Sequence, residues 1–363
     1  MCAELHPHRR AGPQGLRRRQ AGLSIVEIMV GMVVALLVAL AATGGAAVFT
    51  ASQRQGVGAG GMAVNAATAL AAIKSDVASA GLGFFGDSKF LCHTLNLSVD
   101  ATVQMDGTSF APARITAGTG SDQLDVLFAS NVDSGANVLL KGATTGDEAT
   151  LMSLLPVAAG QAVLLAPASA GGTCLVRSVT ATAAATDDVP QTLTFDNTGE
   201  HNAATFTSTA SFVEKDRVAL LGGLQWSRYS VSGGNLTLAR PLLGDSAVLV
   251  RNVMAFRAQY GVSSSASSST LMGWQDAVDD TSGATGVNWS SVAGANVERV
   301  RALRIGLVTR SPQREKEDKD GNCVASESKP VLFGETVEPD VADWACYRYR
   351  SAVVVVPLRN LVW

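Results

Sequence analysis

A single carboxylate, Glu27, stands near the start of a long apolar segment. The residues that follow it carry no charge until Arg54. An ionised group held beside hydrocarbon costs about 3 kcal/mol or more unless it is paired. The carboxylate could reach the lipid headgroups by extending its own side chain, or it could pair with a positive charge from a neighbouring subunit. We favour the second interpretation, which makes Glu27 an assembly residue.

Gly22 lies five residues before Glu27 and three residues after the basic run Arg17–Arg19. A glycine has no side chain to clash with a peptidase that binds the chain in an extended form. An ordinary secretory signal places its cleavage site after an apolar stretch of roughly 7–15 residues. Here the glycine precedes the apolar stretch. Cleavage between Gly22 and Leu23 would therefore leave the apolar segment on the mature protein.

Five cysteines are present, and Cys2 lies in the segment that this cleavage would remove. The other four form no Cys-x-x-Cys pair, and only His93 and His201 follow residue 22, so we expect no zinc site. An even number of cysteines in an exported domain favours two disulfides over four free buried thiols. Three pairings are possible. We favour the two pairs that are near in sequence, Cys92–Cys174 and Cys323–Cys346.

Two other motifs resemble ligand sites but fit poorly. Gly81–Gly86 has the spacing of a dinucleotide fingerprint, yet it follows a helical segment, so its glycines are better explained as a turn from helix into sheet. Segment 316–327 resembles a calcium loop, but Lys316 at its first position would repel the ion, and a solvated loop explains the same composition. No motif of a serine hydrolase or zinc protease occurs. We expect no cofactor, no metal and no catalytic residues.

Four segments are expected to position these residues. Residues 1–22 form a leader with five Arg and one Glu, and residues 23–55 form an apolar transmembrane helix, since about 20 apolar residues cross a hydrocarbon core. Residues 56–82 continue the helix after a soft joint at the glycines near 56–61. Residues 83–363 form a β-rich domain. The positive-inside rule keeps the leader cytoplasmic and places that domain in the periplasm.

The second helical segment has an apolar stripe. Leu70, Ile73 and Val77 recur at helical spacing and should pack on a sheet, whereas Asp76 should point elsewhere. Beyond residue 110 the pattern predicts strands. The serine-rich segment 263–270, together with 276–286, should form a flexible polar connection. The predicted strands are 124–129, 138–141, 162–166, 174–182, 192–196, 217–221, 224–231, 236–240, 248–260, 303–308 and 347–357.

Charge argues against one class of partner. The formal net charge is −3, and removal of the leader, which contributes about +4, leaves the mature chain near −7. It has no basic stripe of the kind that nucleic-acid-binding proteins carry. We therefore expect no direct binding of nucleic acid.

Gly22, Leu23 and Glu27, with the cationic flank and the apolar run, resemble the prepilin signal of type IV pilins and type II secretion pseudopilins. Several later blocks resemble PilW-type minor pilins. The resemblance implies an α+β fold: a long N-terminal hydrophobic helix packed on a large antiparallel β-rich domain. It also implies cleavage after Gly22 by prepilin peptidase and methylation of Leu23. The blocks are 79–86, Arg251–Val262, Val300–Ser311, Tyr347–Arg350 and the ending Val356–Leu361 with Trp363.

The same resemblance implies a function in assembly. The protein would sit in the inner membrane of a Gram-negative bacterium, join other minor pilins and the major pilin, and support adhesion or twitching motility. The alternative within the superfamily is a J-type minor pseudopilin of type II secretion. The alternative from another class is a membrane-anchored periplasmic enzyme or binding protein, which no catalytic or metal cluster supports. Arg359, Asn360 and Trp363 either close the edge of the core or contact another minor pilin.

Overall fold

The structure is a computed structural model that describes residues 24–86, 89–90, 92–130, 136–168, 172–183 and 189–361. Predicted residues Gly22, Leu23 and Trp363 lie outside this part of the chain. The chain divides into two compact units, Met1–Val57 and Gly58–Trp363. A long apolar helix and a large, mainly antiparallel β domain confirm the predicted α+β class.

Helix α1 (Ile25–Ser79) begins in the first unit. Its segment Ile25–Ala46 has a mean hydropathy of 2.7, and none of it is buried within the protein, so its length and composition suit a membrane span. The soft joint expected at the glycines near 56–61 does not interrupt the helix, because α1 runs continuously through them. A glycine costs only about 1 kcal/mol in a helix interior and keeps its N–H donor, so the helix can continue.

The stripe predicted on the second half of α1 is confirmed. Leu70, Ile73 and Val77 are buried in the main hydrophobic core of the second unit. Asp76, predicted to point away, is instead half-buried at the edge of the stripe and accepts a hydrogen bond of 2.7 Å from the Tyr229 hydroxyl. Burial first, and then the neighbouring Asp76 carboxylate, raise the pKa of Tyr229, so this phenol stays a donor.

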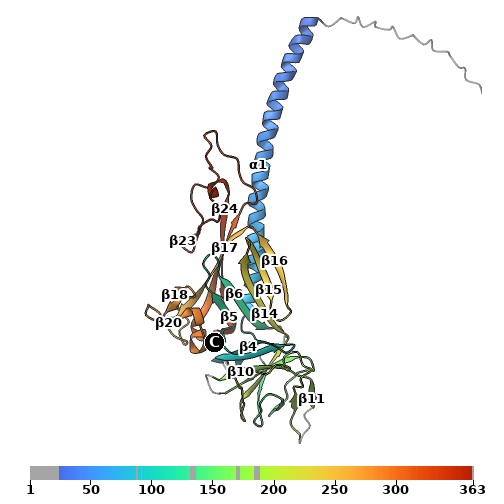
Figure 1. Ribbon diagram of the computed structural model, residues 1–363, viewed down its shortest axis with the longest axis vertical. Coiled ribbons are helices and arrows are strands. Elements are labelled where there is room, and N and C mark those ends of the chain that lie inside the picture. Colours follow the sequence, from blue (N-terminus) through green and yellow to red (C-terminus); the bar gives the residue numbers. More distant parts are fainter. Residues whose placement is uncertain are drawn as a thin grey trace, which may run out of the picture. The chain divides into compact units, whose positions relative to one another are not determined.

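Two antiparallel sheets enclose that core together with α1 (Figure 1). Their strands carry apolar residues at alternate positions on the face toward the helix. The five-stranded sheet has the order β16 (Asp245–Arg251), β15 (Asn235–Arg240), β14 (Leu224–Ser232), β6 (Gln123–Ala129), β5 (Ala113–Thr116). The four-stranded sheet has the order β18 (Leu271–Gln275), β17 (Val253–Ser263), β21 (Val300–Arg310), β24 (Tyr349–Pro357).

A six-stranded sheet separates this core from a second one. Its order is β4 (Thr102–Ser109), β3 (Thr94–Val99), β10 (Thr173–Ser178), β9 (Ala162–Ala166), β13 (Arg217–Gly222), β7 (Asn137–Leu139). Along β9, Leu164 lies in the main core, whereas Val163 and Leu165 lie in the second. Strands covered on both faces read as continuous apolar runs. The second core also contains residues of β8 (Glu148–Thr150) and β12 (Thr192–Thr194), which pair with each other, and β11 (Ala181–Ala183) pairs with β12.

Several predicted strand boundaries are wrong. The expected strand 248–260 is split into β16 and β17 because Asn252 adopts a positive φ of 59°, which breaks the extended run. The expected strand 174–182 is likewise two strands, β10 and β11. Strands β3 and β4, which precede residue 110, were not predicted.

The serine-rich connection is also more structured than expected. β18 pairs with β17, and Arg301 donates to the Ser268 carbonyl oxygen at 3.0 Å, which holds the intervening loop. The remaining short elements are β1 (Phe85–Gly86), β2 (Lys89–Phe90), β19 (Asp279–Asp280), β20 (Val287–Asn288), β22 (Val331–Leu332), β23 (Glu335–Thr336) and the 3₁₀ turns Trp289–Ser291, Gly294–Arg299, Trp344–Cys346 and Arg359–Leu361.

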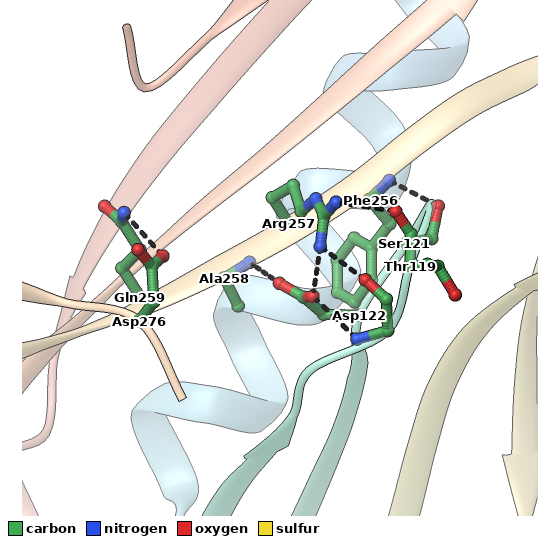
Figure 2. A network of polar contacts seen from close by, with 9 residues as sticks. Thr119, Ser121, Asp122, Phe256, Arg257, Ala258, Gln259 and Asp276 are labelled. Atoms are coloured by element: carbon green, nitrogen blue, oxygen red, sulfur yellow. Dashed lines mark hydrogen bonds and ion pairs between the residues drawn. The ribbon is translucent and has the colours of Figure 1, made fainter. Parts of the chain in front are cut away.

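One buried carboxylate joins the two sheets of the main core. Asp122, in the loop before β6, accepts hydrogen bonds from the Arg257 guanidinium at 2.8 Å, from the Ala258 N–H at 3.0 Å and from the Gly118 N–H at 3.3 Å (Figure 2). Arg257 and Ala258 belong to β17. Ser121 beside it accepts the Phe256 N–H at 3.1 Å. The Arg251–Val262 block, singled out in the sequence, thus holds the four-stranded sheet to the five-stranded one.

Both disulfides have the pairing favoured from the sequence. Cys92 is bonded to Cys174, with Cα atoms 5.5 Å apart, beside the first β3–β10 pairs. Cys323 is bonded to Cys346, with Cα atoms 4.5 Å apart. The second bond ties the charged loop that follows β21 to the turn that precedes β24.

Removing the Cys323–Cys346 bond should lower the free energy of unfolding by about 3 kcal/mol, the loop-closure estimate for a ring of this size. The test is a Cys323→Ser/Cys346→Ser double variant, compared with the parent by urea unfolding without reductant. Mass mapping of the unreduced parent should recover the Cys323–Cys346 pair. Free thiols at both positions in the parent would contradict the assignment.

Candidate assembly site at the start of the helix

The first turn of α1 is capped by Ser24. Its hydroxyl accepts the Val26 N–H at 3.3 Å, and its carbonyl accepts the N–H groups of Glu27 at 3.0 Å and Ile28 at 3.1 Å. Ser24 thus satisfies donors that an uncapped helix would leave unpaired. The sequence interpretation did not identify this residue. The signal was present, because Ser24 and Glu27 have the Ser-x-x-Glu spacing of a capping box.

Glu27 lies on that first turn, exposed and surrounded by exposed apolar side chains. Its carboxylate has no ion-pair partner among the described residues. An acid at a helix N-terminus is stabilised by the helix dipole. Glu27 therefore stands where it can accept a cation from outside its own chain.

The C-terminal end of α1 is capped by a side chain from the end of the same chain. The Asn360 side chain donates to the carbonyl oxygens of Ala80 at 3.3 Å and Ala78 at 3.5 Å. Gly81 and Gly83 follow with positive φ of 78° and 88°, so these glycines turn the chain from helix to sheet as predicted. For Asn360 the packing interpretation is therefore correct. Arg359 remains exposed.

The described residues bring together one candidate cluster of metal-ligating side chains, Glu317, Cys323 and Cys346. Both sulfurs are already joined in the disulfide, which leaves a single exposed carboxylate. In the segment that resembles a calcium loop, the Asp318 carboxylate accepts the N–H groups of Asp320 at 2.9 Å and Asn322 at 2.8 Å. These bonds stabilise the turn itself, as expected of a solvated loop.

The described part of the chain contains His93 and His201, which have different surroundings. His201 is buried, and its Nδ1 lies 2.7 Å from the Ser98 carbonyl oxygen. The Arg177 guanidinium, also buried, donates to the His201 carbonyl at 3.0 Å, and burial lowers the pKa of Arg177. His93 packs beside Gly294. The contacts of His201 and Arg177 link the ends of β3 and β10 to the loop that precedes β13.

Comparison with known proteins gives matches at both ends of the chain. The family described as type IV pilus-assembly protein W matches residues 236–360. The prokaryotic N-terminal methylation motif matches residues 17–43, which include Gly22, Leu23 and Glu27. A search of curated proteins finds no match. Among solved structures, a type IV-like pilin from Thermus thermophilus is 10% identical, with 81% of this chain and 95% of that chain covered and a TM-score of 0.31.

The two family matches and the capped apolar helix fit an inner-membrane-anchored pilin of a Gram-negative bacterium. Pilins of this kind are structural proteins, processed by prepilin peptidase and associated with other pilins. The PilW match extends from β15 to the 3₁₀ turn that caps α1, and it includes Arg257 and Ala258 but not their partner Asp122. Both matches support a PilW-type minor pilin of the type IV pilus: residues 236–360 match the pilus-assembly family and residues 17–43 match the methylation motif.

Proposed function

We propose that this protein is a minor pilin that takes part in initiating type IV pilus assembly. Prepilin peptidase would cleave after Gly22 and the new N-terminal residue, Leu23, would be methylated. The mature chain would remain in the inner membrane through residues 23–55, with its β domain in the periplasm. It would then join other minor pilins and the major pilin in the pilus, at or near the tip, and support adhesion and twitching motility.

The observation that carries this proposal is the exposed Glu27 carboxylate on the first turn of an apolar helix. In a bundle of such helices the carboxylate can meet the N-terminal amine of an adjacent subunit. That pairing offsets the cost of holding a charge beside hydrocarbon, and it sets the axial register between the helices. The match of residues 236–360 to a pilus-assembly family supports the pilus over a type II secretion pseudopilus.

A Glu27→Ala variant should be cleaved and folded but should enter the minor-pilin complex poorly. We expect recovery of partner pilins from detergent-solubilised membranes to fall about tenfold, the equivalent of about 1.4 kcal/mol for one lost charge pair. A cleavage blot of the same membranes should show mature protein.

The matched control is Glu335→Ala, because Glu335 is an exposed acid on β23. It should leave partner recovery unchanged. Recovery of partners at the parent level with Ala at position 27 would show instead that Glu27 only reaches the lipid headgroups.

A further inference from the structure

Strand β24 ends the four-stranded sheet with an exposed apolar edge. Residues Ala352–Val356 are apolar, and the side chains of Val353 and Val355 are 50% and 48% exposed. The neighbouring residues Ala352 and Val354 face the main core on the other side of the sheet. The strand therefore presents two valines to solvent on the outer face of the sheet.

The register of β24 shows which of its main-chain groups are free. Ser311 donates to the Arg348 carbonyl at 2.8 Å, and Leu358 donates to the Arg301 carbonyl at 2.9 Å. β24 pairs with β21 without a register shift between these two bonds. In an antiparallel pair the hydrogen-bonded positions alternate. The main-chain N–H and C=O groups of the even-numbered residues therefore point toward β21. Those of Ser351, Val353 and Val355 point outward, where no described residue forms a hydrogen bond with them.

The other edges of the large sheets carry the features that prevent strand addition. β4 contains Asp106 and irregular register, β16 has Asp245 and Arg251 at its ends, and β5, β7 and β18 are short. β24 has nine residues, a regular register and no charge from Ser351 to Leu358. Among the edges of the four-, five- and six-stranded sheets, β24 therefore has the longest regular run without a charge, and the Ser351 hydroxyl at the start of that run donates to the Val331 carbonyl at 2.8 Å.

The charges at the two ends of β24 restrict its partner. Arg350 and Arg359 are exposed, and neither has a described ion-pair partner. A second copy added antiparallel about Val353 would bring Arg359 near Arg348, and a parallel copy would align Arg350 with itself. Like charges facing one another across strands are destabilising. The complementary strand is apolar at its centre and carries carboxylates at its ends.

We infer that β24 binds an edge strand of another pilin subunit by strand addition, with main-chain hydrogen bonds to Ser351, Val353 and Val355 and ion pairs to Arg350 and Arg359. This inference rests on the proposed function, since it names the surface through which the protein joins its assembly. The Val353 and Val355 side chains pack against the same strand.

The inference can be tested in cells that make the full chain and its pilins. A photo-crosslinking p-benzoylphenylalanine is placed at Val353 or at Val355, with Val248 as the control because it is 51% exposed on β16, the edge of the other sheet. Adducts from positions 353 and 355 to a strand of another pilin, mapped by mass spectrometry, support it. Adducts only to lipid or to the same chain, no adduct, or equal yields from position 248 overturn it.

Two substitutions at one position test the role of the main chain. Val353→Pro removes an outward N–H without touching the β21 ladder, whereas Val353→Thr keeps that donor and the β-branched shape. Partner recovery should fall at least about fivefold for Pro and stay near the parent level for Thr. Equal recovery of partner pilins by the Pro and Thr variants overturns the inference. If the parent chain recovers no pilin, the proposed function fails; if it recovers pilins but position 353 crosslinks none, only the β24 surface is wrong.

Discussion

A Gly22→Trp variant should accumulate almost entirely as uncleaved precursor in the inner membrane. Cleavage requires the residue before the scissile bond to fit closely against the peptidase, and a glycine presents no side chain at that point. An indole there should block access whatever the rest of the chain does. The measurement is the intact mass of the membrane-extracted protein, which reports whether the 22-residue leader remains.

A Gly22→Ala variant is the informative control, because a methyl group adds little volume and should allow partial cleavage. The globular unit begins at Gly58, so both variants should keep their Cys92–Cys174 bond. Normal-sized mature protein from the Trp variant would mean that cleavage occurs elsewhere or not by this route.

An Asp122→Ala variant should lower the free energy of unfolding by about 3–5 kcal/mol. The substitution leaves the buried N–H of Ala258 and the partly buried N–H of Gly118 without their acceptor, and an unsatisfied buried donor costs about 1–3 kcal/mol. It also removes the Arg257 ion pair, whose carboxylate side is only 7% exposed. Urea unfolding of the detergent-solubilised chain at pH 7 measures the change.

The matched control is Asp245→Ala, since Asp245 forms an ion pair with Arg240 in which both side chains are 53% exposed. An exposed pair of this kind contributes about 0–1 kcal/mol. Asp122→Asn should fall between the two, because the amide oxygen still accepts one N–H. Equal losses for Asp122→Ala and Asp245→Ala would show that the network in Figure 2 does not hold the two sheets together.

The sequence was most informative where one local pattern decides the structure. The apolar helix, the stripe at Leu70, Ile73 and Val77, the helix-to-sheet turn at Gly81 and the strand at Ala162–Ala166 all follow from spacing along the chain. The resemblance to pilins was recognisable from the same kind of local signal around Gly22 and Glu27, and the roles assigned to these residues stay predictions.

What the sequence could not predict depends on partners distant in the chain. Asp122 and Arg257 are 135 residues apart, and neither position alone reveals the pair. Asp76 looked like a solvent-facing residue because its hydrogen-bond donor, Tyr229, comes from a strand 153 residues away. Ser24 is the exception: its capping role had a local signal, and it was overlooked because the apolar run after it dominated the interpretation.

The sheet shared by two cores makes the region between β7 and β13 inseparable from the rest of the β domain. Val163, Leu165, Leu175, Val218 and Leu220 cover one core, while their neighbours along the same strands cover the other. Removing the segment that covers the second core would expose these five side chains to water. We therefore expect the two hydrophobic cores to unfold together in one cooperative transition, because β9, β10 and β13 contribute side chains to both.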